Sequence, residues 1–166
     1  MKTVDANTVI DTLGLPYLHD LSTFGALSDA AILSLLRHGE IKRLSKGEIL
    51  YQWHSPVTGF GVVLEGDFAF YKHCEGHDVL TRHFLSGEQM GFDTMIALKP
   101  HSGTAVAAEE TLVLEISSGQ FYDLHIDFPA DFGLLMINLS RELAREIAML
   151  EEVIGQSTGW HLATHL

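Results

Sequence analysis

The sequence predicts a mainly β domain with flanking helices: a double-stranded β-helix, or jelly-roll barrel, followed by a long C-terminal dimerisation helix. Short β-rich segments separated by glycine-containing turns fill the middle of the chain. Helical periodicity precedes and follows them. The length of 166 residues indicates one domain over residues 1–166. We divide it into N-terminal helices (1–40), a β-barrel (41–116), C-terminal helices (117–155) and a tail (156–166).

Composition limits the partners of the chain. The formal net charge is −12, from 10 Lys and Arg against 22 Asp and Glu, and such a field repels nucleic acid and anionic membranes. The apolar runs are too short for a membrane span, and the N-terminus lacks the apolar core of a signal peptide. The single cysteine, Cys74, excludes an internal disulfide and fits a reducing compartment. We therefore expect a cytoplasmic protein that contacts neither nucleic acid nor a membrane directly.

Two helices are predicted before the barrel. Residues 4–13 form a short helix that Gly14-Leu15-Pro16 ends. A second helix begins after Ser28 as N-cap, with Asp29 in its first turn, where the helix dipole favours an acid. Gly39 follows its last residues as the expected C-terminal glycine. The apolar side of this helix consists of Ile32, Leu35 and Leu36.

The barrel strands are recognised by their β-branched and aromatic residues. Turn residues around Gly47, Gly59, Gly66 and Gly76 separate them. The expected strands are residues 49–53, 60–64, 68–72, 79–84 and 111–116. Short strands at this spacing favour an antiparallel barrel or jelly roll.

The stretch from Phe84 to Ala108 organises the predicted site. Gly87 and Gly91 free the backbone for tight conformations and for close approach to a ligand. Residues 92–98 can wind into a short helix whose unpaired N–H groups suit a phosphate. Residues 104–108 then resume an extended strand.

This stretch resembles the phosphate-binding cassette of the cyclic-nucleotide-binding domain, as in the catabolite-activator (CRP–FNR) family. Residues 87–91, GEQMG, match the first half of the family motif, and residues 102–108, SGTAVAA, match the second half in spacing. The pieces KGEILY and VVLEGDFAFY are similar to two further family signatures, although His54 stands where members usually carry glycine. The resemblance covers roughly residues 24–154 and implies the jelly-roll fold and an effector-binding role.

The resemblance also shows which charged residues are missing. The acid that holds the ribose hydroxyl falls on Phe92, and the arginine that pairs with the cyclic phosphate falls on Ser102. Asp93 could replace the acid if the chain slips by one residue, whereas Phe92 could instead fill the emptied pocket. An arginine–phosphate fork is about twice as strong as a neutral hydrogen bond. The expected ligand is therefore a small anionic effector other than cAMP or cGMP, or one of these bound weakly. The predicted ligand site comprises Gly87, Gly91, Phe92, Asp93, His101, Ser102, Gly103 and Thr104.

The last helix is predicted to start at Pro129, after a shorter helix capped by Ser117, and to end near Ile154 because Gly155 follows. Its apolar positions recur about every 3.7 residues, which favours a nearly straight or slightly right-handed helix pair. The predicted seam of a homodimer is Met136, Leu139, Leu143, Ile147 and Leu150. Alternatively, this stripe packs on its own barrel. The residues after the helix are too few for the helix-turn-helix domain that follows in family transcription factors.

Our preferred interpretation is a non-enzymatic, dimeric regulatory domain that binds an effector and signals to a protein partner. It needs no catalytic residue, metal or cofactor. One alternative is a cupin-like metal-dependent enzyme with ligands at His73, His77 and His83. The other is a structural dimer module without a ligand.

Overall fold

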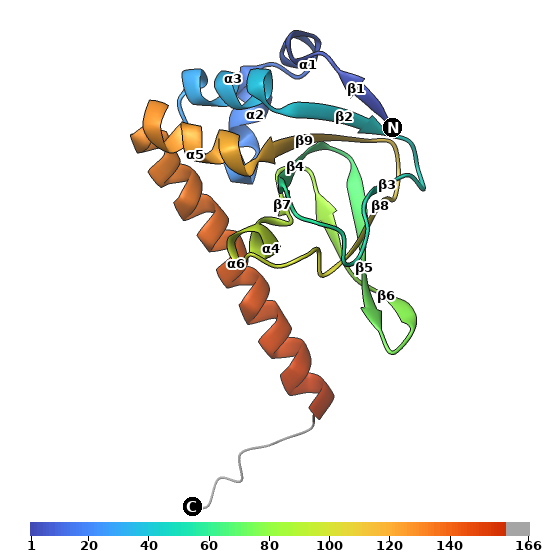
Figure 1. Ribbon diagram of the computed structural model, residues 1–166. Helices are drawn as coiled ribbons and strands as arrows, with labels where there is room; N and C mark the ends of the chain where they lie inside the picture. Colours follow the sequence, from blue (N-terminus) through green and yellow to red (C-terminus); the bar gives the residue numbers. More distant parts are fainter. Residues whose placement is uncertain (159–166) are drawn as a thin grey trace, which may run out of the picture.

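Two antiparallel sheets form the barrel of the computed structural model, which describes residues 1–158 (Figure 1). The first sheet has the strand order β1 (Lys2–Val4), β2 (Glu40–Leu44), β9 (Thr111–Ser117), β4 (Gly59–Glu65) and β7 (Gln89–Met90). The second has the order β3 (Ile49–Tyr51), β8 (Gly103–Ala107), β5 (Asp67–Cys74) and β6 (His77–Leu85). The predicted jelly roll is confirmed, and β1, β2 and β7 are present in addition to the expected strands.

The N-terminus differs from the prediction in two places. Residues 2–4 pair antiparallel with β2, so the helix predicted from Val4 begins later, as α1 (Ala6–Leu13). Its start is fixed by Asp5, whose side chain accepts a hydrogen bond from the Thr8 amide at 3.0 Å. Helix α2 (Leu15–Asp20) was not predicted. It forms because Pro16 lies in its first turn, where a missing N–H costs no helical hydrogen bond.

Helix α3 (Asp29–His38) confirms the second predicted helix, and a short 3₁₀ helix, η1 (Ser22–Phe24), precedes it. The Ser28 hydroxyl accepts from the Ala31 amide at 3.2 Å. Gly39 follows the helix as predicted, but its backbone is extended, with φ −79°. A Cβ on Gly39 would lie 2.6 Å from Leu114 Cδ1, so close packing against β9 is what requires the glycine.

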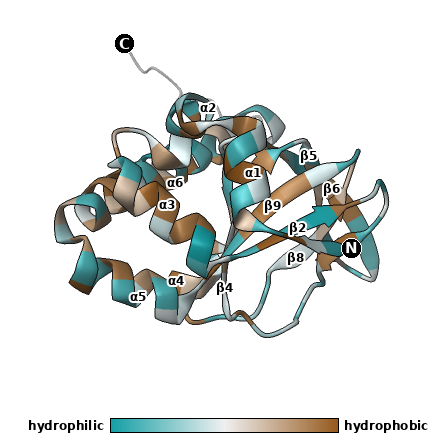
Figure 2. Ribbon diagram, turned by 90° about the horizontal axis from the view of Figure 1, so that it is seen from above, coloured by the Kyte–Doolittle hydropathy of each residue, from teal (hydrophilic) through white to brown (hydrophobic). Residues whose placement is uncertain are grey.

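The hydrophobic core has two parts that share the first sheet. Strand β9 turns Leu112, Leu114 and Ile116 toward the N-terminal and C-terminal helices, and Val113 into the barrel. The barrel interior is completed by Phe68 and other apolar residues of the second sheet. Figure 2 shows the helices α3 and α5 (Ser118–Asp127) with both hydrophobic and hydrophilic residues, as expected for helices that bury one face.

The C-terminal helices begin as predicted and end later. Ser117 caps α5 by accepting from the Gln120 amide at 3.1 Å, while the Gln120 side chain donates to the Leu35 carbonyl. Helix α6 (Pro129–Thr158) starts at Pro129 but continues through Gly155, so the predicted stop was wrong. A helical glycine costs about 1 kcal/mol relative to alanine and does not by itself end a helix. Residues 159–166, most of the predicted tail, lie outside the described residues.

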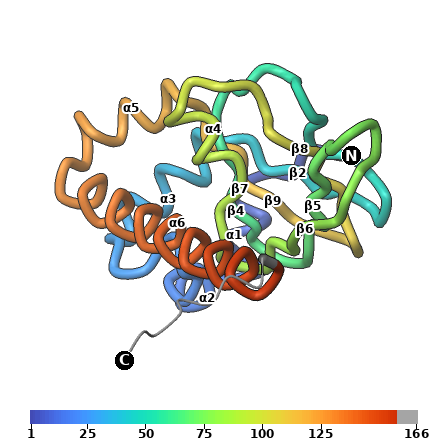
Figure 3. Tube along the Cα trace, turned by 90° about the horizontal axis from the view of Figure 1, so that it is seen from below, coloured from blue at the N-terminus to red at the C-terminus, as the bar shows by residue number. Residues whose placement is uncertain are grey.

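Helix α6 runs across the barrel past α4 (Phe92–Ile96) and β7, and its far end extends beyond the barrel (Figures 1 and 3). Near its start Leu135 and Leu139 are fully buried in the core of the same chain. Asn138, also buried, donates to the carbonyls of Thr23 and Gly25 at 3.2 and 2.8 Å. The first half of α6 therefore belongs to the domain.

We predict that two apolar residues of α6 contribute very differently to stability. Leu139→Ala should lower the free energy of unfolding by about 2–5 kcal/mol because it leaves a cavity in the core. Ile137→Ala, two residues away and 54% exposed, should lower it by less than about 1 kcal/mol. Urea denaturation of both variants measures the difference, and equal losses would contradict the packing described for α6.

Candidate functional site

A cavity of about 530 Å³ lies between the second sheet, the segment around α4 and the middle of α6. Its apolar walls are Phe70, Phe84, Ile96, Leu143, Ile147 and Leu150. Its polar groups come from Lys72, Arg82, Gln89, Asp93, His101, Ser102 and Glu146. The surface of the cavity walls is mainly apolar, and a cavity of this size with polar groups converging on it is typical of a small-molecule site.

The glycine turn, residues 87–91, forms one edge of this region and adopts the predicted conformation. Gly87 and Gly91 have φ angles of 93° and 84°, which favour glycine. The Gly87 amide donates to the Val63 carbonyl at 2.8 Å. Its carbonyl accepts from the Thr23 amide at 3.1 Å and lies 2.7 and 2.8 Å from the Thr23 and Ser22 hydroxyls. The turn is thereby fixed to both β4 and η1.

Phe92 was expected at the ligand site, and the structure places it elsewhere. It is 2% exposed and packs edge-to-face against Phe60 and Phe121 in the core beneath the helices. Its side chain does not line this cavity. Its amide donates to the Gln89 side-chain oxygen at 3.2 Å, so one N–H group expected to face a phosphate already has a partner.

Asp93 lines the cavity in its place, next to the aromatic pair formed by His101 and Tyr51. The two rings stack with centroids 3.7 Å apart and planes 8° apart. Burial lowers the pKa of His101, and nearby Asp93 opposes this shift only in part. His101 is therefore mainly uncharged near pH 7 and does not replace the missing cation.

Ser102, where the family arginine is expected, contacts a cation that sequence analysis missed. The Lys72 ammonium donates to the Ser102 hydroxyl at 2.7 Å. The register of β5 and β8 sets Lys72 opposite Gly103, so Ser102 is its neighbour. A Cβ on Gly103 would lie 2.5 Å from Phe70, so glycine is needed where the two strands meet. The available signal was the alternation along β5, which turns residues 68, 70 and 72 to one face.

Arg82 on β6 is a second cation that sequence analysis missed. It forms an ion pair with Glu146 of α6 at 2.9 Å and lies 3.7 Å from Glu88 of the glycine turn. Its guanidinium also lies over the Phe84 ring, 4.0 Å from the centroid. Arg82 therefore joins the barrel, the glycine turn and α6 at the edge of the cavity.

Glu142 of α6 is a half-buried carboxylate that contacts the glycine turn and η1. It accepts from the Gln89 amide at 3.1 Å and lies 2.8 and 3.2 Å from the Ser22 and Thr23 hydroxyls. Burial raises the pKa of Glu142, and these hydrogen bonds oppose the shift only in part. Each hydroxyl has one proton and two acceptors, Glu142 and the Gly87 carbonyl, so the protonation of Glu142 affects the hydrogen bonding of the glycine turn.

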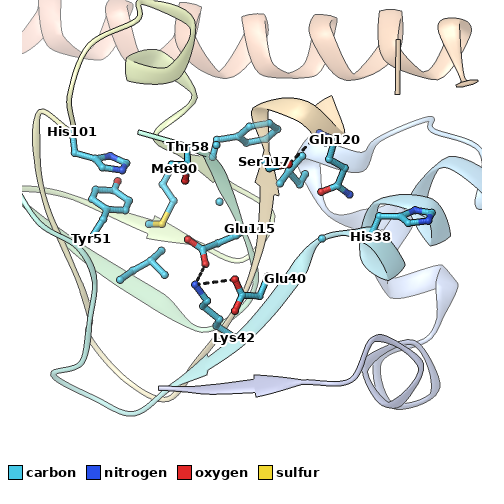
Figure 4. A pocket seen from close by; sticks show the side chains of 16 residues that line it. His38, Glu40, Lys42, Tyr51, Thr58, Met90, His101, Glu115, Ser117 and Gln120 are labelled. Atoms are coloured by element: carbon cyan, nitrogen blue, oxygen red, sulfur yellow. Dashed lines mark hydrogen bonds and ion pairs between the residues drawn. The ribbon is translucent and has the colours of Figure 1, made fainter. Parts of the chain in front are cut away.

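A second, smaller cavity of about 240 Å³ opens at the other side of the His101–Tyr51 pair (Figure 4). Figure 4 shows Lys42 pointing between two carboxylates. It lies 3.3 Å from Glu40 and forms an ion pair with Glu115. Within residues 1–158, Lys42 is the one lysine or arginine that lines this cavity, and it is already paired with Glu40 and Glu115. This cavity is therefore less suited to an anion than the first.

The residues considered for a metal site are separated. His73 contacts Asp78 at 3.0 Å, and His83 contacts Asp67 at 2.8 Å. Within residues 1–158, no group of three His, Cys, Asp or Glu side chains could hold a metal ion. The cupin-like ligand set considered from the sequence is therefore not assembled in this part of the chain.

The predicted dimer stripe divides into two parts. Leu139 is fully buried in its own domain, and Met136 and Leu143 pack partly against the same core. Leu139 is thus unavailable to a partner helix, because the stripe packs on its own barrel in the first half of α6. Ile147 and Leu150 are 58% and 49% exposed.

None of the helices in residues 1–158 is long and apolar enough to span a membrane.

The comparisons agree with a ligand-binding jelly roll. A family model described as the cyclic nucleotide-binding domain matches residues 41–127. The chain therefore belongs to the cyclic nucleotide-binding domain family, as the motifs of the CRP–FNR type indicated. No curated protein is similar enough in sequence to be matched with this chain.

Several solved structures share the fold. A cyclic nucleotide-binding domain from Methylobacillus flagellatus KT has a TM-score of 0.81 at 18% identity, over 97% of this chain and 91% of that one. The Thermus thermophilus catabolite activator protein has a TM-score of 0.69 at 19% identity, over 82% and 63%. The sensor domain of the transcriptional regulator DNR from Pseudomonas aeruginosa has a TM-score of 0.64 at 18% identity, over 86% and 93%.

Glu142 predicts a pH dependence. The pKa of Glu142 is higher in the folded than in the unfolded protein. Its contribution to stability is therefore fully present below the unfolded-state pKa and is lost as pH rises through the folded-state pKa. The unfolding free energy of the wild type minus that of Glu142→Gln should therefore fall as pH rises above about 4.5. Urea denaturation between pH 4 and about 7.5 measures this, with Glu152→Gln controlling for the lost charge. A difference that stays constant or increases would contradict it.

Proposed function

We propose that this chain is a non-enzymatic regulatory domain whose effector binds in the 530 Å³ cavity and changes the position or stability of α6. The observation that supports this most strongly is that Leu143, Glu146, Ile147 and Leu150 of α6 form one wall of the cavity. A ligand there exchanges contacts with the helix, and only such differential contacts can shift a conformational equilibrium.

Helix α6 is also linked to the glycine turn through Glu142 and to the barrel through Arg82 and Glu146. Both links lie within one or two turns of the cavity wall. An effector that moves the turn therefore acts on the middle of α6, from which the second half extends beyond the barrel. We propose that this half transmits the signal to a protein partner in the cytoplasm, without direct contact with nucleic acid or a membrane.

A screen of cyclic nucleotides and other small anionic metabolites by thermal shift tests the proposal, because a ligand that binds only the folded state raises Tm. Ile96→Trp is a useful control, since Ile96 lines the cavity and is 54% exposed, so the larger ring can enter the cavity with little disturbance of the core. An effector that stabilises the wild type should lose its effect in this variant. Stabilisation that persists would place binding elsewhere.

We predict that cAMP and cGMP bind weakly or not at all. Ser102 offers no guanidinium fork, and a carboxylate at position 92 is replaced by a phenylalanine packed in the core. Calorimetry should give dissociation constants above about 100 μM, which corresponds to less than about 5.5 kcal/mol of binding free energy. Low-micromolar affinity for either nucleotide would refute this. Phe92→Glu is unsuitable for restoring the site, because it would bury a carboxylate among Phe60 and Phe121.

The second half of α6 suggests a homodimer. Its exposed apolar residues are Ile147, Met149, Leu150, Val153 and Ile154. Large exposed apolar patches commonly mark interaction sites, and a seam between identical helices has two-fold symmetry. We propose that this seam keeps Ile147 and Leu150 from the predicted stripe and continues toward the C-terminal end of α6.

Val153→Glu should dissociate this dimer, because symmetry places two new carboxylates in one apolar seam. Val153 does not line the cavity, so the substitution leaves the ligand site intact. Sedimentation velocity at micromolar concentration should show a dimer for the wild type and a monomer for the variant. Ile137→Glu, at an exposed site in the first half of α6, should remain dimeric. A monomeric wild type, or a dimeric Val153→Glu, would disprove the seam.

A further inference from the structure

We infer that Lys72 supplies the cationic contact for the effector and that the effector is an organic compound with a single phosphate group. The inference rests on the proposed function of the cavity. In the family motif an arginine provides the positive charge. We assign this role to Lys72, which lies on a different strand, β5.

The position of Lys72 is fixed by the fold. It lies opposite Gly103 in the pairing of β5 and β8, and its ammonium group reaches the Ser102 hydroxyl at 2.7 Å. Phe70, two residues earlier on the same face, lies with its ring centroid 5.3 Å from the ammonium nitrogen. The Lys72 ammonium therefore lies beside Ser102, the residue at the position of the family arginine, and it reaches Ser102 from the neighbouring strand.

The charge of Lys72 is not compensated within the described chain. The ion pairs between residues 1 and 158 include Lys42 with Glu40 and Glu115, and Arg82 with Glu88 and Glu146. They include no carboxylate within 4.0 Å of Lys72. A partly buried cation without an acid is favourable only if water or a bound anion contacts it.

The free hydrogen-bonding groups indicate a phosphate. An ammonium group has three donors, and Ser102 accepts only one of them. The Ser102 hydroxyl keeps its own proton for donation. The two remaining ammonium donors and the Ser102 hydroxyl lie on groups only 2.7 Å apart, which suits a compact anion with several acceptor oxygens, and lysine binds such an anion as a point charge.

The remaining walls define the rest of the ligand. Phe70, Phe84, Ile96 and Leu150 favour an apolar or aromatic body. Asp93 and Glu146, which also line the cavity, repel a second anionic group. The cavity therefore suits one phosphate on a mainly apolar body better than a polyphosphate.

The test compares two probes with the same body, 1-naphthyl phosphate and uncharged 1-naphthol, by calorimetry on the full chain. Lys72→Met should weaken binding of the phosphate at least about tenfold, the value of one charge-assisted hydrogen bond, and change 1-naphthol binding less than about twofold. Lys46→Met, at an exposed turn residue, makes the same change in net charge and should leave both affinities unchanged. Adding Ser102→Arg to Lys72→Met should restore most of the lost affinity.

The outcomes separate the two proposals. If Ile96→Trp abolishes binding of both probes but Lys72→Met has no selective effect on the phosphate, the role of Lys72 is wrong and the cavity remains the ligand site. If neither probe binds the wild type, or Ile96→Trp leaves both affinities unchanged, the proposed ligand site itself is wrong. Competition with inorganic phosphate distinguishes recognition of the phosphate group from recognition of the naphthyl ring. Inorganic phosphate should displace 1-naphthyl phosphate from the wild type but not from Lys72→Met.

Discussion

The hydrogen bonds around Gly87 hold the glycine turn, η1 and α6 together. The Gly87 carbonyl accepts from the Thr23 amide, and the Ser22 and Thr23 hydroxyls lie between this carbonyl and the Glu142 carboxylate. The contacts of Glu142 with Ser22 and Thr23 join residues 120 and 119 positions apart in sequence. A Cβ on Gly87 would lie 2.9 Å from the Ser22 amide nitrogen, and the φ angle of 93° is unfavourable for other residues. The glycine turn and α6 share these partners, and both line the cavity, so this junction joins two of its walls.

The charged residues of the candidate site lie next to the positions at which the family motif places its acid and its arginine. Phe92 stands at the position of an acid and turns into the core, while Asp93 faces the cavity. Ser102 stands at the position of an arginine, and Lys72 contacts it from β5. A β-sheet permits this exchange because residues on adjacent strands lie as close as residues along one strand. The candidate site therefore has an acid and a cation beside the two positions where the family motif places its charged residues.

The two halves of helix α6 meet different surroundings, which would allow the proposed effector binding and helix pairing to share one helix. Leu135 and Leu139 are fully buried, whereas Ile147 and Val153 are more than half exposed. The cavity lies at the transition, where Leu143 and Glu146 line it. Effector binding and helix pairing would thus involve adjacent turns of one helix, so a movement caused by one would be transmitted directly to the other.

The sequence by itself determined the jelly-roll class, the order of the main elements and the N-caps of α3 and α5. Ser28 and Ser117 act as N-caps, and Gly87 and Gly91 adopt left-handed angles, because such preferences depend on residues close in the chain. The pairing of β1, the direction of the Phe92 side chain and the approach of Lys72 to Ser102 were decided only by the tertiary structure. Each depends on which distant strand or helix lies alongside, and periodicity along one segment contains no information about that neighbour. The same reason explains why Leu139 belongs to the core although its spacing fits the exposed stripe equally well.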